Sequence, residues 1–464
     1  MTSNLAKIRV RAFTGKKLAI PIYLWRTMIK REMQEIRLGI VGLGTVGQGV
    51  LELLERQGAF YASALGVRFR VVAASSRSES SLGRVAYKGC FKTTDPLAVA
   101  QHPDVDVFVE LAGGEDAPKA WVEAALDSGK HVVTANKALL AKHGATLFPL
   151  AAKHGRALLF EAAVGGGIPI VRTLQESLIA NDIGGLACII NGTCNYILTQ
   201  MAVKKESFAT ALAEAQRLGY AEADPGFDID GVDALHKVAL LASIAHGRYV
   251  DYRLLSVEGI RNVSALDIRM AEELGYEVKL LGVVEQAASG KILAAVYPAL
   301  LERSHQLASV QGVLNAVYLK TSAAGPLLLT GAGAGKLPTA SSVLSDLVAV
   351  ARHAADGAMP PPSMAYFSAT NAADLTPIDD LETEFYLRLT TVDKPGVLSR
   401  VTGILGDEGI SIRALSQKPE HDPENVPVII LTHAARNARV TAALKKIDAL
   451  DVIREPTRVI RFYK

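Results

Sequence analysis

The chain has few cysteines, few aromatic residues and no long hydrophobic run, and each of these absences excludes a class of protein. Its three cysteines, Cys90, Cys188 and Cys194, contain no CxxC pair and provide neither a disulfide framework nor a zinc cage. No apolar stretch reaches the roughly 18 residues that span a bilayer, so we expect no membrane protein. An odd number of cysteines without a disulfide framework indicates a reducing compartment, and we expect the protein in the cytoplasm.

Acidic residues are absent from the first 31 positions, which hold eight basic ones. The rest of the 464 residues carries 42 basic against 47 acidic side chains, so the body is mildly acidic although the net charge is +3. Because a nucleic-acid reader needs a concentrated basic face, we expect no nucleic-acid partner. We interpret residues 1–35 as a basic N-terminal extension. An upstream extension of the reading frame, ahead of Met28 or Met33, is favoured over a targeting segment, because no clear cleavage site is present.

Strand-like and helix-like segments alternate from residue 36 to 162, which is typical of a Rossmann-type, doubly wound α/β sheet. The predicted strands are Ile36–Val41, Phe69–Ser75, Val105–Glu110, His131–Thr134 and Ala157–Phe160. The later pattern predicts an α+β domain over 163–330, a helix over 331–355 that returns to the first domain, a proline-rich linker over 356–382 and a separate, ferredoxin-like βαββαβ domain over 383–464.

A GxGxxG pattern, Gly42, Gly44 and Gly47, directly follows the first predicted strand and opens a helix. Glycines in this context allow a tight turn and let a pyrophosphate reach the helix N-terminus, so the pattern predicts a dinucleotide site, with an ordinary tight turn as the alternative. The second strand ends in Ser75, Ser76 and Arg77, without the acid typical of an NAD site. Since an arginine there can pair with a 2′-phosphate, NADP is favoured over NAD, with a solvated loop residue as the alternative for Arg77.

Polar residues at element ends suggest a second site. Lys137 follows the fourth strand, at the sheet edge where ligands of such folds bind, although a surface lysine is the alternative. Asn191 and Thr193 lie in a turn that offers N–H groups to an anion or simply caps a helix. Asp233 and Lys237 are four apart and share a helix face. Taken alone, such a pair is most often an exposed ion pair of small energy; because that helix continues as an apolar run, a buried pair facing a cleft is the alternative.

Several motifs follow one another in an order similar to that of homoserine dehydrogenases, and the chain resembles this family over roughly residues 36 to 355. These motifs are GLGTVG, TANK, EAAVGGGIPI, NGTCNYIL, GYAEADPGFDIDGVDALHK and GAGAGKLPTASSVLSDL. The resemblance implies reversible, NAD(P)H-dependent reduction of L-aspartate 4-semialdehyde to L-homoserine in threonine, methionine and isoleucine biosynthesis.

The resemblance also implies residue roles. It makes Lys237 the general acid/base, Asp233 a carboxylate that orients the substrate, and Lys137 the residue between nicotinamide and substrate. Glu222 corresponds to the ligand of the substrate amino group, with Asp228 nearby. It further implies that Thr45, Val46 and Gly331 contact the dinucleotide, and that a monovalent cation, Na⁺ or K⁺, binds largely through backbone oxygens of Glu161, Val164, Gly166 and Ile168.

Residues 383–464 resemble an ACT domain, through the DKPGVL motif at 393–398 and GISIR at 409–413. Such a domain implies a small amino acid bound at a dimer interface, hence feedback inhibition by L-threonine, with a degenerate ACT fold that only dimerises as the alternative. We expect a homodimer or homotetramer.

Two rival functions are less consistent with these residues. An aspartate-semialdehyde dehydrogenase would need Cys194 as its nucleophile and leaves the Asp233–Lys237 pair unexplained. An amino-acid sensor with a dead catalytic half would have no need for Lys137, Glu222, Asp233 and Lys237 together. With about 35 residues ahead of the first strand, we expect no fused aspartokinase domain.

Overall fold

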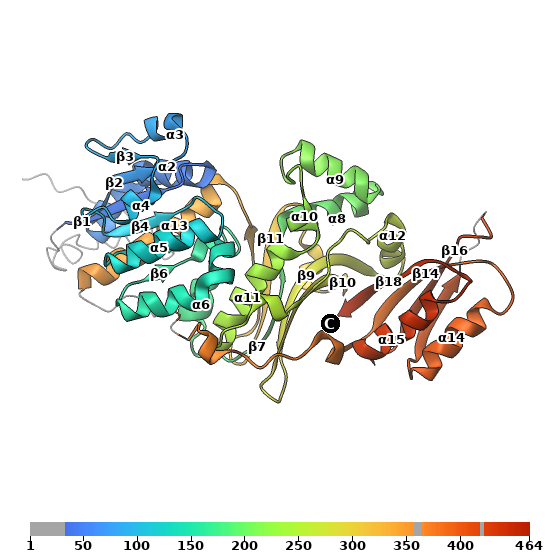
Figure 1. Cartoon of the computed structure of the whole chain (residues 1–464). Coiled ribbons are helices and arrows are strands. Elements are labelled where there is room, and N and C mark those ends of the chain that lie inside the picture. The colour runs from blue at the N-terminus through green and yellow to red at the C-terminus, as the bar shows by residue number, and fades with distance from the viewer. Residues whose placement is uncertain (1–32, 357–363, 365, 418–421) are drawn as a thin grey trace, which may run out of the picture.

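The computed structural model describes residues 33–356, 364, 366–417 and 422–464, which form three units in a row (Figure 1). The predicted basic extension lies outside the described residues except for 33–35, and the first strand, β1 (Gln34–Val41), begins two residues before the predicted start.

The first unit contains a six-stranded parallel sheet in the order β3-β2-β1-β4-β5-β6, which confirms the predicted doubly wound fold. Its other strands are β2 (Val67–Ser75), β3 (Phe91–Thr93), β4 (Val107–Glu110), β5 (His131–Thr134) and β6 (Leu158–Leu159), of which β3 was not predicted. Helices α4 (Pro96–Ala100), α5 (Asp116–Asp127) and α6 (Lys137–Lys153) cover one face, and α2 (Thr45–Phe60) and α13 (Lys336–Asp356) the other. The short helix α3 (Glu79–Gly83) follows β2.

Helix α13 returns from the end of the second unit to pack on α2, as Figure 1 shows in orange beside blue. Its apolar residues Ala340, Val343 and Leu347 join the core beneath β1 and β2. A Cβ on Gly49 of α2 would lie 2.5 Å from the carbonyl oxygen of Lys336, so only a glycine lets the two helices approach this closely.

The second unit is built on a mixed sheet that continues into the third. The strand order is β12-β11-β7-β9-β10-β18-β14-β16-β15, with β8 beside β10. The second unit supplies β7 (Ile183–Ile189), β8 (Ser256–Val257), β9 (Tyr276–Gln286), β10 (Ile292–Glu302), β11 (Leu314–Thr321) and β12 (Gly325–Ala332). Its helices are α7 (Ile170–Arg172), α8 (Gly192–Lys204), α9 (Phe208–Arg217), α10 (Gly226–Ile229), α11 (Val232–His246) and α12 (Ala265–Glu273).

The third unit has the predicted βαββαβ order. It consists of β14 (Phe385–Thr391), α14 (Val397–Asp407), β15 (Ile412–Gln417), β16 (Val426–Thr432), α15 (Asn437–Asp448) and β18 (Ile453–Tyr463), with the two-residue strands β13 (Glu382–Thr383) and β17 (Ala435–Arg436). The sequence suggested a separate domain, yet Ala299–Leu301 of β10 pair in parallel with Arg461–Tyr463 of β18. The third unit therefore extends the sheet of the second through backbone hydrogen bonds.

Residues 366–381, in the second half of the predicted linker, pack along the first and second units. Isolated bridges join Tyr249 to Ala372 and Ile292 to Leu375, and the buried ring of Phe367 contacts those of Phe148 and Tyr249. This segment thus lies against the protein between α13 and β13.

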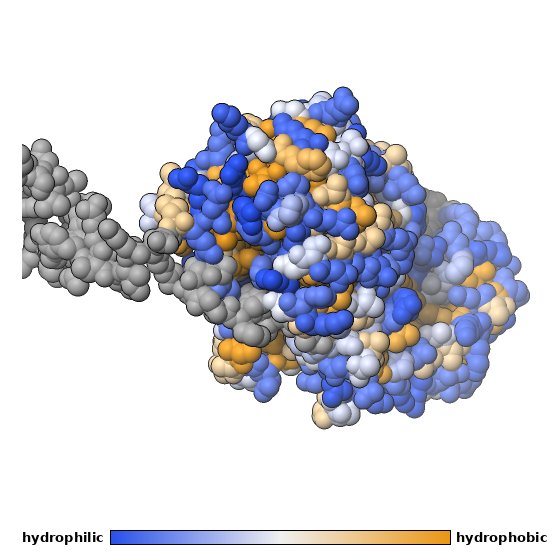
Figure 2. All heavy atoms as spheres, turned by 60° about the vertical axis from the view of Figure 1, so that its left-hand side comes forward, coloured by the Kyte–Doolittle hydropathy of each residue, from blue (hydrophilic) through white to orange (hydrophobic). Residues whose placement is uncertain are grey.

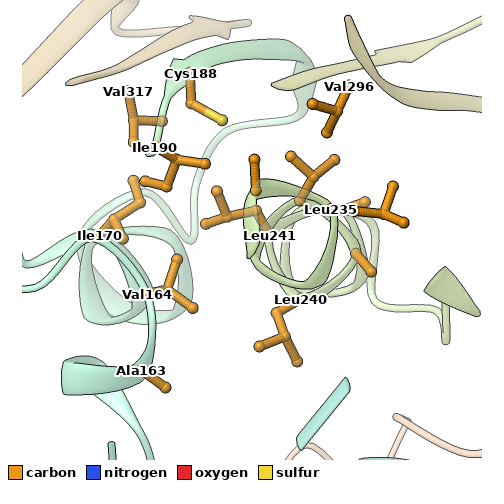
Figure 3. Packing of buried hydrophobic residues seen from close by; sticks show 14 of the residues in the cluster. Ala163, Val164, Ile170, Cys188, Ile190, Leu235, Leu240, Leu241, Val296 and Val317 are labelled. Carbon is orange, nitrogen blue, oxygen red and sulfur yellow. The ribbon is translucent and has the colours of Figure 1, made fainter. Parts of the chain in front are cut away.

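Helix α11 lies at the centre of the molecule, between the mixed sheet and the first unit (Figure 1). In Figure 3, α11 lies beside Cys188 and Val296 of the sheet on one side and beside the segment with Val164 and Ile170 on another, and its labelled leucines point in different directions around the helix. The helix can lie close to β9 because a Cβ on Gly282 would come within 2.2 Å of Val238 Cγ2. Burial on all sides explains why its sequence is apolar around most of its circumference.

The face of the molecule that Figure 2 shows carries many hydrophilic residues, with patches of hydrophobic residues between them. Over the residues that the structure describes, none of the helices has both the length and the apolar character needed to cross a bilayer.

Candidate functional site

A cleft of about 760 Å³ opens at the carboxyl ends of β1, β2 and β4, and its lining includes Gly42 and Gly44 of the glycine pattern. Gly42 has a φ of +91°, and a Cβ on Gly47 would lie 2.2 Å from the Gly42 carbonyl oxygen, so both positions require glycine. Gly44 has no neighbour within 4 Å of a Cβ and starts α2 without a side-chain cap. Its open surroundings and the free N–H groups of the first turn, which includes Thr45 and Val46, fit the pyrophosphate of a dinucleotide.

The end of β2 borders the same cleft. Ser75, Ser76, Arg77 and Ser78 line it, and Arg77 is exposed. Hydroxyl groups and a guanidinium can hold a phosphate through several hydrogen bonds, whereas nothing in this segment offers a carboxylate to ribose hydroxyls.

A second cleft, of about 530 Å³, lies between the first and second units and contains the predicted polar residues. Lys237 donates from Nζ to Asp233 Oδ2 at 2.8 Å and to the Ile190 carbonyl oxygen at 2.9 Å. Lys137 lies with its Nζ 3.0 Å from Asp233 Oδ1, and Asn191 donates from Nδ2 to Asp233 Oδ2 at 2.9 Å and to Asp228 Oδ1 at 2.7 Å. One buried carboxylate thus holds two lysines from different units.

Charge balance explains the protonation state of these groups. Burial alone would raise the pKa of Asp233, but the ammonium groups of Lys237 and Lys137 and the hydrogen bond from Asn191 keep it well below its usual range. Burial raises the pKa of Asp228, which lies near the negative charge of Asp233. The carboxylate form of Asp233 is therefore favoured, and its two oxygens contact Lys137 and Lys237 in the cleft.

Three helices begin at the wall of this cleft. Asn136 caps α6 and Asn191 caps α8, each through its side-chain oxygen, while α11 begins after Gly231, which has a φ of +84°. The N-terminal ends of helices carry partial positive charge, so the cleft favours an anionic ligand. The caps also fix the side chains nearby, since Lys137 is the first residue of α6 and Asp233 lies in the first turn of α11.

Not every predicted ligand lies in the cleft. Thr193 lines it and donates its hydroxyl to the Tyr220 carbonyl oxygen at 2.6 Å, but the side chain of Glu222 is exposed and outside the lining. Gly331 is in β12, immediately before the lining residues Ala332 to Gly335.

The sequence reasoning missed Asn315 on β11, which is 1% exposed. Asn315 lines the cleft, and its Oδ1 has no hydrogen-bond partner among the described residues. Asn315 falls in the predicted α+β domain over 163–330, and nothing in the sequence pattern indicated which side chains of that domain line the cleft.

The predicted cation loop is buried and already partly hydrogen-bonded. The carboxylate of Glu161 accepts the backbone N–H groups of Val171 at 2.8 Å and Arg172 at 2.9 Å, and the Gly166 carbonyl oxygen accepts the Ser342 hydroxyl at 2.6 Å. Val164 and Ile168 are also buried. Because the Glu161 carboxylate is already engaged, the oxygen ligands that this loop can offer a cation are its backbone carbonyl groups. Oxygen ligands of this kind suit a hard monovalent ion. The described residues hold no group of three or more His, Cys, Asp or Glu side chains arranged for a metal.

Cys194 does not have the surroundings of a nucleophile. Burial raises the pKa of its thiol well above the usual range, and the carboxylates of Asp228 and Asp233 add to this effect. Its Sγ donates to the Asp228 carbonyl oxygen at 3.2 Å. The rival mechanism that needs a reactive Cys194 therefore has no support in the structure.

Comparison with known proteins agrees with this geometry. The family model described as "Homoserine dehydrogenase" matches residues 169–348, "Homoserine dehydrogenase, NAD binding domain" matches 42–161, and "ACT domain" matches 385–450. The homoserine dehydrogenase of Neisseria gonorrhoeae is 42% identical over 431 residues, 92% of this chain and 99% of the relative. That of Pseudomonas aeruginosa is 42% identical over 432 residues, again 92% and 99%.

Solved structures lead to the same family. A homoserine dehydrogenase from Thiobacillus denitrificans superposes with a TM-score of 0.87 at 44% identity, over 94% of this chain and 99% of that one. A hyperthermophilic archaeal homoserine dehydrogenase in complex with NADPH has a TM-score of 0.58 at 27% identity, over 68% and 97%. The chain therefore belongs to the homoserine dehydrogenase family and carries a C-terminal ACT domain.

Proposed function

We propose that this protein catalyses the reversible reduction of L-aspartate 4-semialdehyde to L-homoserine with NADP(H), in threonine, methionine and isoleucine biosynthesis. The observation that carries the proposal is the Lys237 ammonium group, held by Asp233 inside a polar cleft beside the dinucleotide site. An oxidoreductase of this kind needs a proton donor at the carbonyl oxygen, and a bound nicotinamide supplies or accepts the hydride.

Lys237 is suited to that proton transfer. Of its three ammonium donors, two are engaged by Asp233 Oδ2 and the Ile190 carbonyl oxygen, which leaves one for a ligand in the cleft. The neighbouring carboxylate orients the ammonium group, and the proton passes to the substrate oxygen as negative charge develops there. In the reverse direction the neutral amine removes the hydroxyl proton.

The other residues orient the substrate. Asp228 and Glu222 are proposed to bind its ammonium group, and Asn191 and Thr193 border the same space at the start of α8. Lys137 and the three helix N-termini would attract its carboxylate. Glu222 lies outside the cleft lining, so its role requires the segment around Tyr220 to bring it closer when substrate binds.

The assay is homoserine oxidation, followed with NAD⁺ and NADP⁺ in parallel. Replacing Lys237 with Met should lower kcat by about 10²- to 10⁴-fold, the usual contribution of a positioned acid or base, while NADPH affinity stays nearly constant. A variant with near-normal turnover would refute the role. A strong preference for NADP⁺ that Arg77→Ala abolishes would support the proposed contact between Arg77 and the 2′-phosphate.

We also propose that the cation loop of Glu161, Val164, Gly166 and Ile168 binds Na⁺ or K⁺ through backbone oxygens. The support is the buried loop itself, which lies directly beside the cleft through Gly166. Replacing both ions with a bulky organic cation should lower activity, and unchanged activity would count against the site.

L-Threonine is proposed as the feedback inhibitor, bound to the ACT domain of a homodimer or homotetramer. A cavity of about 340 Å³ at Asp393–Val397 and the end of β14 has the size and polarity for a small amino acid. Deleting residues 383–464 is a poor test, because it would expose the edge of β10. Asp393→Asn should instead weaken inhibition, whereas Asp407→Asn, an exposed acid on α14, should not. Sedimentation would establish the oligomer.

The three cysteines are unpaired, which supports a reducing compartment such as the cytoplasm.

A further inference from the structure

Glu110 is a buried carboxylate at the centre of the nucleotide-binding unit. It is not among the lining residues of either cleft and belongs to none of the sequence motifs described above. It is the last residue of β4 and has no exposed surface. In the sheet it is paired with Val41 of β1 on one side and with Thr134 of β5 on the other. This is the place where the strand order reverses and where ligands of such sheets bind.

One oxygen of Glu110 shapes the wall of the dinucleotide cleft. Its Oε1 accepts the backbone N–H groups of Ala112 at 2.8 Å and Gly113 at 3.2 Å. Both residues line the cleft, and Gly113 and Gly114 have φ values of +72° and +89°. The loop therefore turns tightly around the carboxylate, which fixes the position of its backbone.

The other oxygen reaches toward the second cleft. Oε2 accepts the Thr134 hydroxyl at 2.6 Å, and Thr134 Oγ1 accepts the backbone N–H of Asn136 at 3.0 Å. Asn136 donates to the Gly114 carbonyl oxygen at 2.7 Å and caps α6 through Leu139 N–H at 3.1 Å. The next residue, Lys137, forms the ion pair with Asp233.

We propose that Glu110 is a positioning residue that holds the dinucleotide wall and Lys137 in a fixed relation across the two clefts. It contacts neither ligand, and acts through the Ala112–Gly114 backbone on one side and through Thr134 and Asn136 on the other. A carboxylate is needed because every group that it meets is a donor, and an acceptor-only side chain satisfies them all at once. This inference rests on the proposed function only in assigning Lys137 to the reaction.

The test separates the two branches of the network. Glu110→Gln keeps the shape but places a donor where the Thr134 hydroxyl needs an acceptor. It should weaken NADPH binding, measured by fluorescence titration, and lower kcat for homoserine oxidation by about 10- to 100-fold, the scale of a small misplacement of reacting groups. Thr134→Val should lower kcat with little change in NADPH affinity, and Thr134→Ser should restore it.

A double mutant tests whether Glu110 acts through Lys137. In a Lys137→Ala background, Glu110→Gln should cause little additional loss of kcat, because the side chain being positioned is already gone. Lys130→Met is the matched control, since Lys130 is buried at the opposite end of β5 and donates to the Val105 carbonyl oxygen. It should lower thermal stability without changing NADPH affinity or kcat.

Two results would overturn the proposal. One is a Glu110→Gln variant that, like the Lys130→Met control, loses only thermal stability. The other is a Glu110→Gln variant whose loss of kcat is as large in the Lys137→Ala background as in the otherwise unmodified protein. NADPH titration does not depend on the substrate, so failure of the proposed homoserine chemistry in the unmodified protein would be seen separately.

Discussion

The ion pair between Arg388 and Asp267 should hold the ACT domain to the catalytic part of the chain. Arg388 lies on β14 and donates from Nε to Asp267 Oδ1 at 2.6 Å and from Nη2 to Oδ2 at 3.2 Å. Asp267 belongs to α12 of the second unit, and its side chain is fully buried. The Tyr386 hydroxyl also donates to this carboxylate, at 3.0 Å, as does Ser264 in a capping box.

We predict that Arg388→Met loosens this connection by about 3 kcal/mol. Removing one partner of a buried ion pair typically costs about 3–5 kcal/mol, because the other charge stays buried. The lower end applies here, since Tyr386 and Ser264 remain as neutral donors to Asp267. If β14 opens locally, about 3 kcal/mol corresponds to amide exchange that is faster by roughly 10²-fold.

Hydrogen exchange of peptides from β14 and β18 is the assay, carried out on the whole chain. Arg400→Met is the control, because Arg400 pairs with Asp451 at 2.8 Å in the same domain but both side chains are largely exposed. Such a pair contributes about 1 kcal/mol or less. The double variant Arg388→Met with Asp267→Asn should recover much of the protection, since no charge is left unpaired. Equal exchange in Arg388→Met and Arg400→Met would refute the reasoning.

Three further predictions concern the first unit and the cleft. Gly47→Ala should abolish NADPH binding in a fluorescence titration, because its Cβ would lie 2.2 Å from the Gly42 carbonyl oxygen; wild-type affinity would contradict this. Asp233→Asn should lower kcat by about 10²-fold or more, since Lys237 loses the carboxylate that orients its ammonium group, and a steady-state assay with kcat near wild type would count against it. Burial, together with the positive charge of Arg156, lowers the pKa of His131 from 6.5 to about 4. As pH falls from 6.5 to 4, the imidazole binds a proton in the unfolded chain before it does so in the folded protein, so the folded protein loses stability over this range. His131→Gln should flatten this part of the melting-temperature profile, and an unchanged slope would argue against the assignment.

Local patterns were sufficient to predict the architecture of the first unit and the ACT-like order of the third. The strands that precede Gly42 and Lys137 each contain a short apolar run. The turns that follow these strands contain the residue types that their geometry requires. Asp233 and Lys237 could be placed on one face because four residues are about one helical turn. The strand β3 escaped prediction because it is only three residues long and largely exposed.

Other features depend on partners far away along the chain. Asn315 faces the cleft only because β11 pairs with β7 and β12 at a particular register. Arg388 meets Asp267 across 121 positions, and neither residue is distinctive in its local sequence. Lys137 and Asp233 come from different units, so their contact needed the docking of α6 against α11.

The sequence by itself therefore determined the dinucleotide turn, the sequence of helices and strands, and the residue types of the cleft, because these follow from short-range backbone geometry and from side-chain periodicity. Only the tertiary structure decided that one buried carboxylate, Asp233, binds two lysines, that Cys194 is inaccessible, and that β18 joins the ACT sheet to β10. Such contacts arise when whole elements pack together, and packing is set by the summed complementarity of many surfaces rather than by any single segment.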